Sequence, residues 1–148
     1  CDEEGVRLIL LSGANPSAQL PLGGLINRRG DALSDAVVER ISGRDDVVRA
    51  LNWYDSALTH PSYWSADRLH MNARGHHRVA ARVLGSLGLE APGEWWSLPV
   101  DDQPPVLARG EYFREHLAPW VRRRLTGRSS GDNRQPKFGS WIEVAPRA

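Results

Sequence analysis

The chain has 148 residues, of which 41% are hydrophobic and 25% charged, with a formal net charge of +1 and one cysteine, Cys1. This composition is typical of a globular protein, and a single cysteine excludes an intrachain disulfide framework and a cysteine-rich zinc site. No run approaches the roughly 18 apolar residues of a membrane span, and the first residues lack the basic segment of a signal peptide. We therefore expect a cytoplasmic protein without stable membrane insertion.

The distribution of charge and the first residues of the chain give two further indications. Residues 1–105 carry 10 Lys/Arg and 14 Asp/Glu, whereas residues 106–148 carry 9 and 4, so the tail is basic. The only methionine is Met71, and the first residues are typical of the interior of a domain, which predicts a fragment. Alternatively, Cys1 is the lipid-bearing first residue of a lipoprotein, but such a start normally precedes a polar spacer, and strand-forming residues begin here at Val6.

The first half of the chain predicts a strand, a loop and a helix. Residues 6–11 (VRLILL) form an almost continuous apolar run, typical of a central strand buried on both faces of a parallel sheet. Residues 16–30 are rich in glycine and proline, which predicts a loop. Residues 31–42 predict an amphipathic helix that ends before a glycine, because its apolar side chains recur every four residues: Leu33, Val37 and Ile41.

A second strand and a second helix follow. Residues 47–54 (VVRALNWY) are β-branched and aromatic, which predicts a strand. Asn72 is a good N-cap for a helix that runs to about residue 87, where Gly88 ends it. Alternation of strand and helix predicts an α/β fold with parallel strands. Since sheets typically have about four to six strands, we expect further strands before residue 1.

The remaining residues predict a connector and a tail. Residues 91–105 contain four prolines and two tryptophans, which indicates a semi-rigid connector. Residues 111–125 predict a helix kinked at Pro119 whose apolar side chains share one side: Phe113, Leu117, Trp120, Val121 and Leu125. We therefore divide the chain into a domain portion at 1–90, a connector at 91–108 and a basic helical and irregular tail at 109–148.

The candidate catalytic residues are Asp67 and His70. A serine esterase needs an imidazole that takes the hydroxyl proton, and a carboxylate that holds the imidazole in the correct tautomer. The two residues have these types, lie three positions apart before a helix, and are expected at the carboxyl edge of the sheet, where open α/β sheets bind ligands. Because D-x-x-H also occurs by chance, the alternative is a surface aspartate beside a histidine at a helix start.

The residues around this pair carry a family resemblance. Residues 64–80 (WSADRLHMNARGHHRVA) resemble the last motif block of SGNH/GDSL-type hydrolases, where W-x-x-D-x-x-H precedes a small residue, a G-H pair and an apolar helix ending in L-G. Residues 10–16 resemble the fourth strand and following turn of actinobacterial members, and residues 114–132 are similar to a tail of that subgroup. The resemblance covers nearly the whole chain.

The resemblance implies the C-terminal part of a three-layer α/β/α, flavodoxin-like sandwich with a parallel sheet, followed by the basic helical tail. It implies that His70 is the general base and then the acid, and that Asp67 orients it. The family's serine lies in an N-terminal G-D-S motif, which this sequence lacks, and Asn15 lies too late to be the oxyanion asparagine. We expect the intact protein to hydrolyse an acyl or acetyl ester without a cofactor, and this chain alone, without the N-terminal half, to be inactive.

Other interpretations compete with parts of this one. The parent protein is alternatively a non-catalytic binding protein with the same fold, and a G-D-S segment upstream of Cys1 would distinguish the enzyme from it.

Ser12 is a possible substitute nucleophile because it ends a strand, but serine is common in turns for conformational reasons. His76 and His77 are possible metal ligands, yet adjacent helical residues point about 100° apart, so we expect no metal, His76 packed at the helix start and His77 exposed.

The partner that we expect is a small-molecule, lipid or sugar ester. The arginine-rich tail is alternatively a nucleic-acid or membrane-surface element. We favour instead a helix that docks its apolar face on the hydrolase body and leaves its arginines in solvent, without binding nucleic acid.

Overall fold

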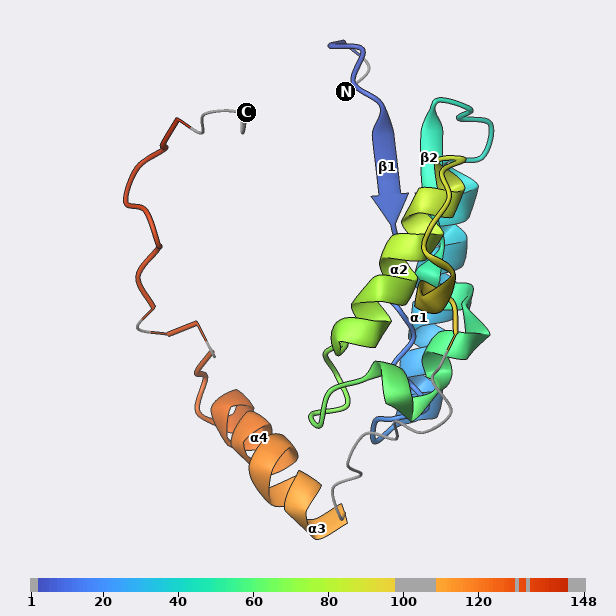
Figure 1. Cartoon of the computed structure of the whole chain (residues 1–148). Helices are drawn as coiled ribbons and strands as arrows, with labels where there is room; N and C mark the ends of the chain where they lie inside the picture. The colour runs from blue at the N-terminus through green and yellow to red at the C-terminus, as the bar shows by residue number, and fades with distance from the viewer. Residues whose placement is uncertain (1–2, 98–108, 130, 133, 144–148) are drawn as a thin grey trace. The chain divides into compact units, whose positions relative to one another are not determined.

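The computed structural model describes residues 3–97, 109–129, 131–132 and 134–143 (Figure 1). The chain divides into two compact units, Cys1–Leu107 and Ala108–Ala148, which are described separately. The main elements of the first unit are β1 (Leu8–Leu11), α1 (Gly23–Arg40), β2 (Val47–Ala50) and α2 (Ala73–Ser86). None of the described helices is long and apolar enough to cross a membrane.

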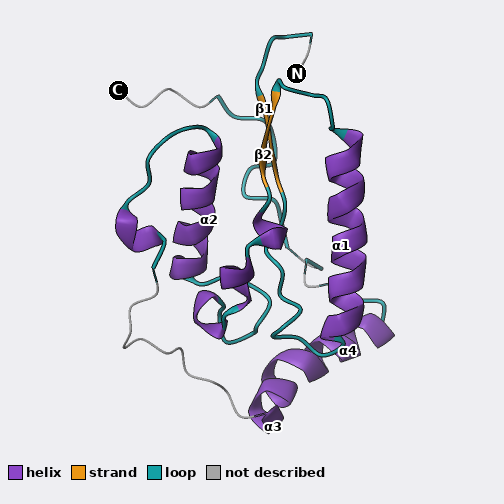
Figure 2. Cartoon of the chain, turned by 90° about the vertical axis from the view of Figure 1, so that its right-hand side faces the viewer, coloured by secondary structure: helices purple, strands orange, loops and turns teal. Residues whose placement is uncertain are grey.

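The two strands form a parallel pair, which confirms the predicted α/β character of this unit. Leu8 pairs with Val47 and Leu11 with Ala50. Helices α1 and α2 lie on opposite sides of the pair (Figure 2). The prediction that the first strand is buried on both faces is wrong here, because β1 pairs with β2 alone among the described residues and its side chains are only half-buried, with Leu11 exposed.

Side-chain hydrogen bonds end β2 earlier than predicted. The Asn52 side-chain amide donates to the Ser12 carbonyl at 3.1 Å, and the Trp53 backbone N–H donates to the Ser12 hydroxyl at 2.8 Å. These bonds replace the strand ladder, so Asn52–Tyr54 form a 3₁₀ turn instead of continuing the strand. Two further 3₁₀ turns, Ser56–Thr59 and Pro61–Tyr63, lead toward α2.

Helix α1 differs from its prediction in both length and orientation. It begins at Gly23, so the loop predicted for residues 16–30 is wrong from that residue onward. Of the predicted buried stripe, Leu33 is 67% exposed, whereas Ser34 is buried. Polar contacts explain the orientation, because Asp31 accepts a 2.8 Å hydrogen bond from the Trp53 ring N–H and Asn27 accepts one of 2.7 Å from Asn15.

Helix α1 approaches the Trp53 ring closely at Gly30. A β-carbon at this position would lie 1.8 Å from the Trp53 ring, which its bond to Asp31 holds in place. We expect Gly30→Ala to lower the free energy of unfolding by about 1–3 kcal/mol, the usual cost of overpacking, in urea denaturation. The control is Gly24→Ala in the same helix, where a β-carbon meets nothing within 4 Å and should be neutral or slightly stabilising. Equal effects of the two substitutions would contradict this packing.

Helix α2 confirms its prediction. The Asn72 side chain caps it by accepting a 3.1 Å hydrogen bond from the Gly75 N–H, and Gly88, with φ +75°, follows its C-terminus. Its Val79 packs on a buried cluster of Leu58, Tyr63 and Trp64. The middle of α2 is therefore anchored directly on the core.

The second unit contains the predicted tail helix in three parts. These are α3 (Arg109–Tyr112), a π-helical turn (Phe113–Leu117) and α4 (Ala118–Leu125). Pro119 has no N–H for the Glu115 carbonyl and its ring crowds that carbonyl, so the predicted kink takes the form of a wider turn. Most of the predicted connector, residues 98–108, lies outside the described residues, and Gly93–Trp95 form a 3₁₀ turn before it.

Candidate functional site

A tight turn between Trp64 and Met71 carries both predicted catalytic residues. Trp64 and Met71 form an antiparallel bridge, and the Ser65 N–H donates to the His70 carbonyl at 2.8 Å. At the tip, the Arg68 N–H donates to the Ser65 carbonyl at 2.9 Å, and Arg68 adopts a left-handed φ of 60°. The turn brings the side chains at positions 67 and 70 to the same side.

The base of this turn is fixed to the core and to α2. The buried Trp64 ring donates to the Leu58 carbonyl at 2.7 Å. The Asn72 side chain, which caps α2, also donates to the Ser62 carbonyl at 2.8 Å and to the Trp64 carbonyl at 3.2 Å. Gly75 allows the approach, since a β-carbon there would lie 2.4 Å from the Tyr63 carbonyl oxygen. The turn is therefore held on a rigid base.

Asp67 and His70 are in direct contact. His70 Nδ1 lies 2.5 Å from one carboxylate oxygen of Asp67. The other oxygen accepts hydrogen bonds of 3.0 Å from the backbone N–H groups of Leu69 and His70. Partial burial raises the pKa of Asp67, but the hydrogen bonds from the His70 ring and from these N–H groups outweigh burial, so the pKa is lowered overall. The carboxylate therefore stays charged as an acceptor for the ring.

This contact gives the two imidazole nitrogens of His70 different protonation. Because Asp67 is an acceptor, the neutral His70 ring carries its proton on Nδ1 and leaves a lone pair on Nε2. Nε2 has no hydrogen-bond partner among the described residues, and the side chain is 76% exposed. Such a nitrogen is able to take a proton from an incoming hydroxyl.

The tautomer of His70 is directly measurable. We expect long-range ¹H–¹⁵N NMR of the neutral ring to show a protonated Nδ1 and an unprotonated Nε2, because Asp67 accepts from Nδ1. Asp67→Ala should remove this preference. The exposed His76 provides an internal control, since its ring has no hydrogen bond among the described residues and should be unaffected by the substitution. A protonated Nε2 in the unmodified protein would contradict the geometry.

The other candidates of the sequence are placed elsewhere. The Ser12 hydroxyl accepts the Trp53 N–H, which gives it a structural role at the end of β1. His76 is exposed, so the prediction that it packs at the helix start is wrong, because Gly75 occupies the buried position there. His77 is exposed as predicted and stacks on Trp95 at 4.9 Å between ring centroids. No group of three or more metal-ligating side chains is found in the described part of the chain.

Sequence reasoning missed a buried ion pair beside the core. Both oxygens of Asp55 accept from Arg78, at 2.8 Å from Nε and 3.0 Å from Nη2, and Arg82 lies 3.4 Å away. Burial raises the pKa of Asp55, but the bonds and charges of the two arginines lower it by more. Arg78 also donates to the Trp96 carbonyl at 2.7 Å. The partners are 23 residues apart, so no local spacing signals the pair.

The turn thus holds an acid–base pair, Asp67 and His70, and no nucleophile is assigned beside it among the described residues. No protein-family model, curated protein or solved structure matches the chain.

Proposed function

We propose that the chain is part of an SGNH/GDSL-type serine hydrolase in which Asp67 and His70 are the acid–base members of a catalytic triad. The observation that carries the proposal is the 2.5 Å contact between Asp67 and His70 Nδ1, with Nε2 without a partner among the described residues. A carboxylate, an oriented imidazole and an accessible second nitrogen are what general-base activation of a hydroxyl requires.

The proposed reaction uses each nitrogen of His70 for one task. Nε2 takes the proton of a serine hydroxyl while the serine oxygen attacks the ester carbonyl. The imidazolium then gives this proton to the departing alcohol, which leaves an acyl-enzyme, and water releases the acid by the same two proton transfers. Asp67 remains a carboxylate throughout and offsets the positive charge on the ring.

The serine in this proposal comes from polypeptide outside the 148 residues. The sequence has no G-D-S segment, and Ser12 uses its hydroxyl as an acceptor for the Trp53 N–H. The family's oxyanion donors are the N–H of that serine and a glycine and an asparagine in two further blocks, which also have no counterpart in this sequence. The chain alone is accordingly expected to be inactive toward esters.

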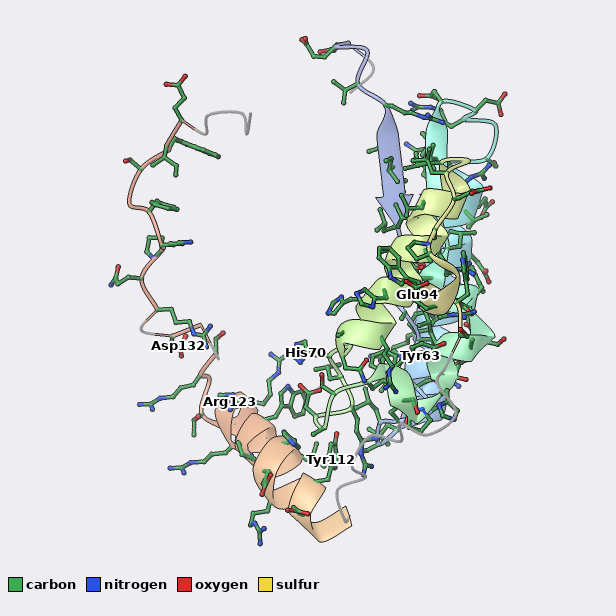
Figure 3. The ribbon with its side chains drawn as sticks, viewed as in Figure 1. Tyr63, His70, Glu94, Tyr112, Arg123 and Asp132 are labelled. Carbon is green, nitrogen blue, oxygen red and sulfur yellow. The ribbon has the colours of Figure 1, made fainter. Side chains whose placement is uncertain are left out.

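The arrangement of the first unit supports this proposal. His70 lies beyond the carboxyl ends of β1 and β2 (Figure 3), which is the edge where open α/β sheets bind their ligands. Helices on both sides of a parallel strand pair suit the C-terminal part of a three-layer α/β/α sandwich. We propose an acyl or acetyl ester of a small alcohol, lipid or sugar as the substrate class.

The test is a hydrolysis screen of the complete protein against p-nitrophenyl esters of short and long acyl chains and against acetylated sugars. Turnover of at least one of them, together with a G-D-S serine upstream of Cys1, is expected. A complete protein with neither turnover nor this serine would instead be a non-catalytic binding protein of the same architecture.

A further inference from the structure

Helix α4 separates basic from apolar side chains. At about 100° per residue, one half of its circumference carries Arg122, Arg123 and Thr126 beside Ala118 and Pro119. The opposite half carries an aromatic residue, two aliphatic residues and one arginine, which are Trp120, Val121, Leu125 and Arg124. This division is that of an amphipathic helix with an arginine-rich polar face.

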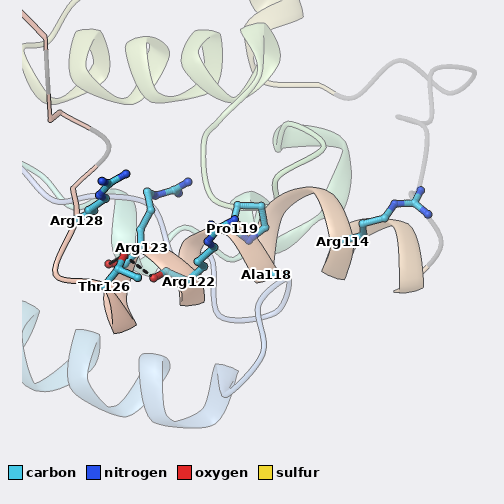
Figure 4. A pocket seen from close by; sticks show the side chains of 7 residues that line it. All are labelled: Arg114, Ala118, Pro119, Arg122, Arg123, Thr126 and Arg128. Carbon is cyan, nitrogen blue, oxygen red and sulfur yellow. Dashed lines mark hydrogen bonds between the residues drawn. The ribbon is translucent and has the colours of Figure 1, made fainter.

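The basic half of α4 lines a concave surface with two further arginines. Arg114 borders it at the π-helical turn, and Arg128 borders it after the helix (Figure 4). Gly127, with φ +65°, turns the chain back so that the Arg128 N–H donates to the Arg123 carbonyl at 2.9 Å. This cap places Arg128 next to Arg123, and Figure 4 shows both side chains extending to the same side of the helix.

Few carboxylates neutralise these arginines. Arg114 has a long contact of 3.8 Å with Glu115, whereas the described carboxylates form no ion pair with Arg122, Arg123 or Arg128. Residues 106–148 as a whole carry nine Lys/Arg and four Asp/Glu. The surface therefore has an excess of positive charge that a partner with several anionic groups would complement.

The apolar half of α4 is uncovered within its unit. Trp120 is 49% and Leu125 83% exposed, and the Arg124 guanidinium lies 5.6 Å from the centre of the Trp120 ring. The segment after the helix adds further exposed side chains, namely Phe138, Trp141 and Ile142, and the Lys137 ammonium lies 5.5 Å from the centre of the Phe138 ring. Exposed tryptophan and aliphatic side chains flanked by arginine and lysine are typical of protein surfaces that lie in the headgroup region of a bilayer.

We propose that this second unit binds the surface of an anionic lipid membrane. Arg114, Arg122, Arg123 and Arg128 contact lipid phosphate and carboxylate groups, while Trp120, Val121 and Leu125 enter the boundary between headgroups and acyl chains. The attachment is interfacial and reversible. It replaces the predicted docking of this helix on the first unit, which would cover the apolar side chains but leave the excess of arginines without a partner. It concerns a different part of the chain from Asp67 and His70, so it stands whether or not the protein hydrolyses esters.

The apolar half distinguishes a membrane from the other polyanions. A nucleic acid would neutralise the arginines, but phosphate-backbone binding has no use for Val121 and Leu125. A bilayer uses both halves at once, because burial of apolar area and attraction to anionic headgroups act together. The opposite placement of the two kinds of side chain around one helix therefore favours the lipid surface.

The test is co-sedimentation of the complete protein with large vesicles. We expect vesicles of equal parts phosphatidylcholine and phosphatidylserine to bind it more than about tenfold better than phosphatidylcholine alone, and binding to weaken with salt. Arg122→Glu with Arg123→Glu should weaken binding more than about tenfold, and Arg128→Glu or Trp120→Ala several-fold. The matched control reverses another pair of adjacent arginines, Arg28 and Arg29 on the exposed side of α1, and should change binding less than about twofold.

Three results would overturn the proposal. They are equal binding to both kinds of vesicle, an equal loss in the Arg28 and Arg29 control, and undiminished binding of Trp120→Ala. If Trp120→Ala binds vesicles undiminished and a single-stranded oligonucleotide displaces the vesicles completely, the arginines bind a soluble polyanion instead. Circular dichroism checks the helix, and if the Arg122 and Arg123 double variant loses helicity, Arg128→Glu and Trp120→Ala decide.

Discussion

Replacing His70 by alanine in the complete protein is expected to lower kcat for a p-nitrophenyl ester by at least about 1000-fold. The substitution removes the only nitrogen that the proposed mechanism uses to take and return the serine proton. Since the His70 side chain is 76% exposed and makes its ring contact with Asp67, the fold should persist. Initial rates at saturating substrate, with circular dichroism of both proteins, measure the effect.

Two further variants show whether the loss is specific to this imidazole. Asp67→Asn keeps the shape of the side chain but removes its charge, and should also lower kcat strongly because the ring loses its orienting carboxylate. His76→Ala removes another exposed imidazole from the same motif and should leave kcat within about twofold, since a large loss of transition-state stabilisation requires contact with the reacting groups. If His70→Ala retained activity within a few-fold of the unmodified protein, the assigned base would be wrong.

Replacing Arg78 by alanine is expected to cost about 3–5 kcal/mol of unfolding free energy, the usual range when one partner of a buried ion pair is removed. Asp55 is buried and Arg78 binds both of its oxygens, so the variant leaves a desolvated carboxylate that Arg82, 3.4 Å away, compensates only in part. Arg78 also lies 5.7 Å from the ring centres of Tyr63 and Trp96, so its packing is lost as well. Urea denaturation followed by fluorescence gives the difference.

The comparison for this loss is Arg29→Ala, which removes an exposed arginine from α1 and should change stability by less than about 0.5 kcal/mol. Arg78→Lys should restore only part of the loss, because an ammonium group cannot bind both carboxylate oxygens with the geometry of a guanidinium. A cost below about 1 kcal/mol for Arg78→Ala would show that the pair is not a main support of the unit.

Elements encoded by neighbouring residues were predictable from the sequence. Helix α2 has its cap, Asn72, and its terminating glycine, Gly88, within a few positions of its ends. The contact between Asp67 and His70 is equally local, because a tight turn brings residues three positions apart together. The parallel pairing of the strands follows from the helix that connects them.

Features that depend on distant residues were not predictable. The apolar residues of α1 suggest that Leu33 and Val37 face inward, but the helix is oriented by polar contacts that include a hydrogen bond from the Trp53 ring to Asp31, and Trp53 follows the helix by a whole strand. The same holds for Asp55 and Arg78, which meet only after the 3₁₀ turns have folded back on α2. The spacing of apolar residues identifies a helix and its apolar side, but it does not show which polar groups of distant residues the helix contacts.

The most direct test of the central claim is the site and rate of labelling by a fluorophosphonate, which reacts with serines activated by a general base. Peptide mass spectrometry of the complete protein should find one modified serine, located outside these 148 residues. His70→Ala should slow its labelling by at least about 1000-fold. A modified serine within these residues, or labelling that is as fast without His70, would contradict the assignment of Asp67 and His70 to a catalytic triad.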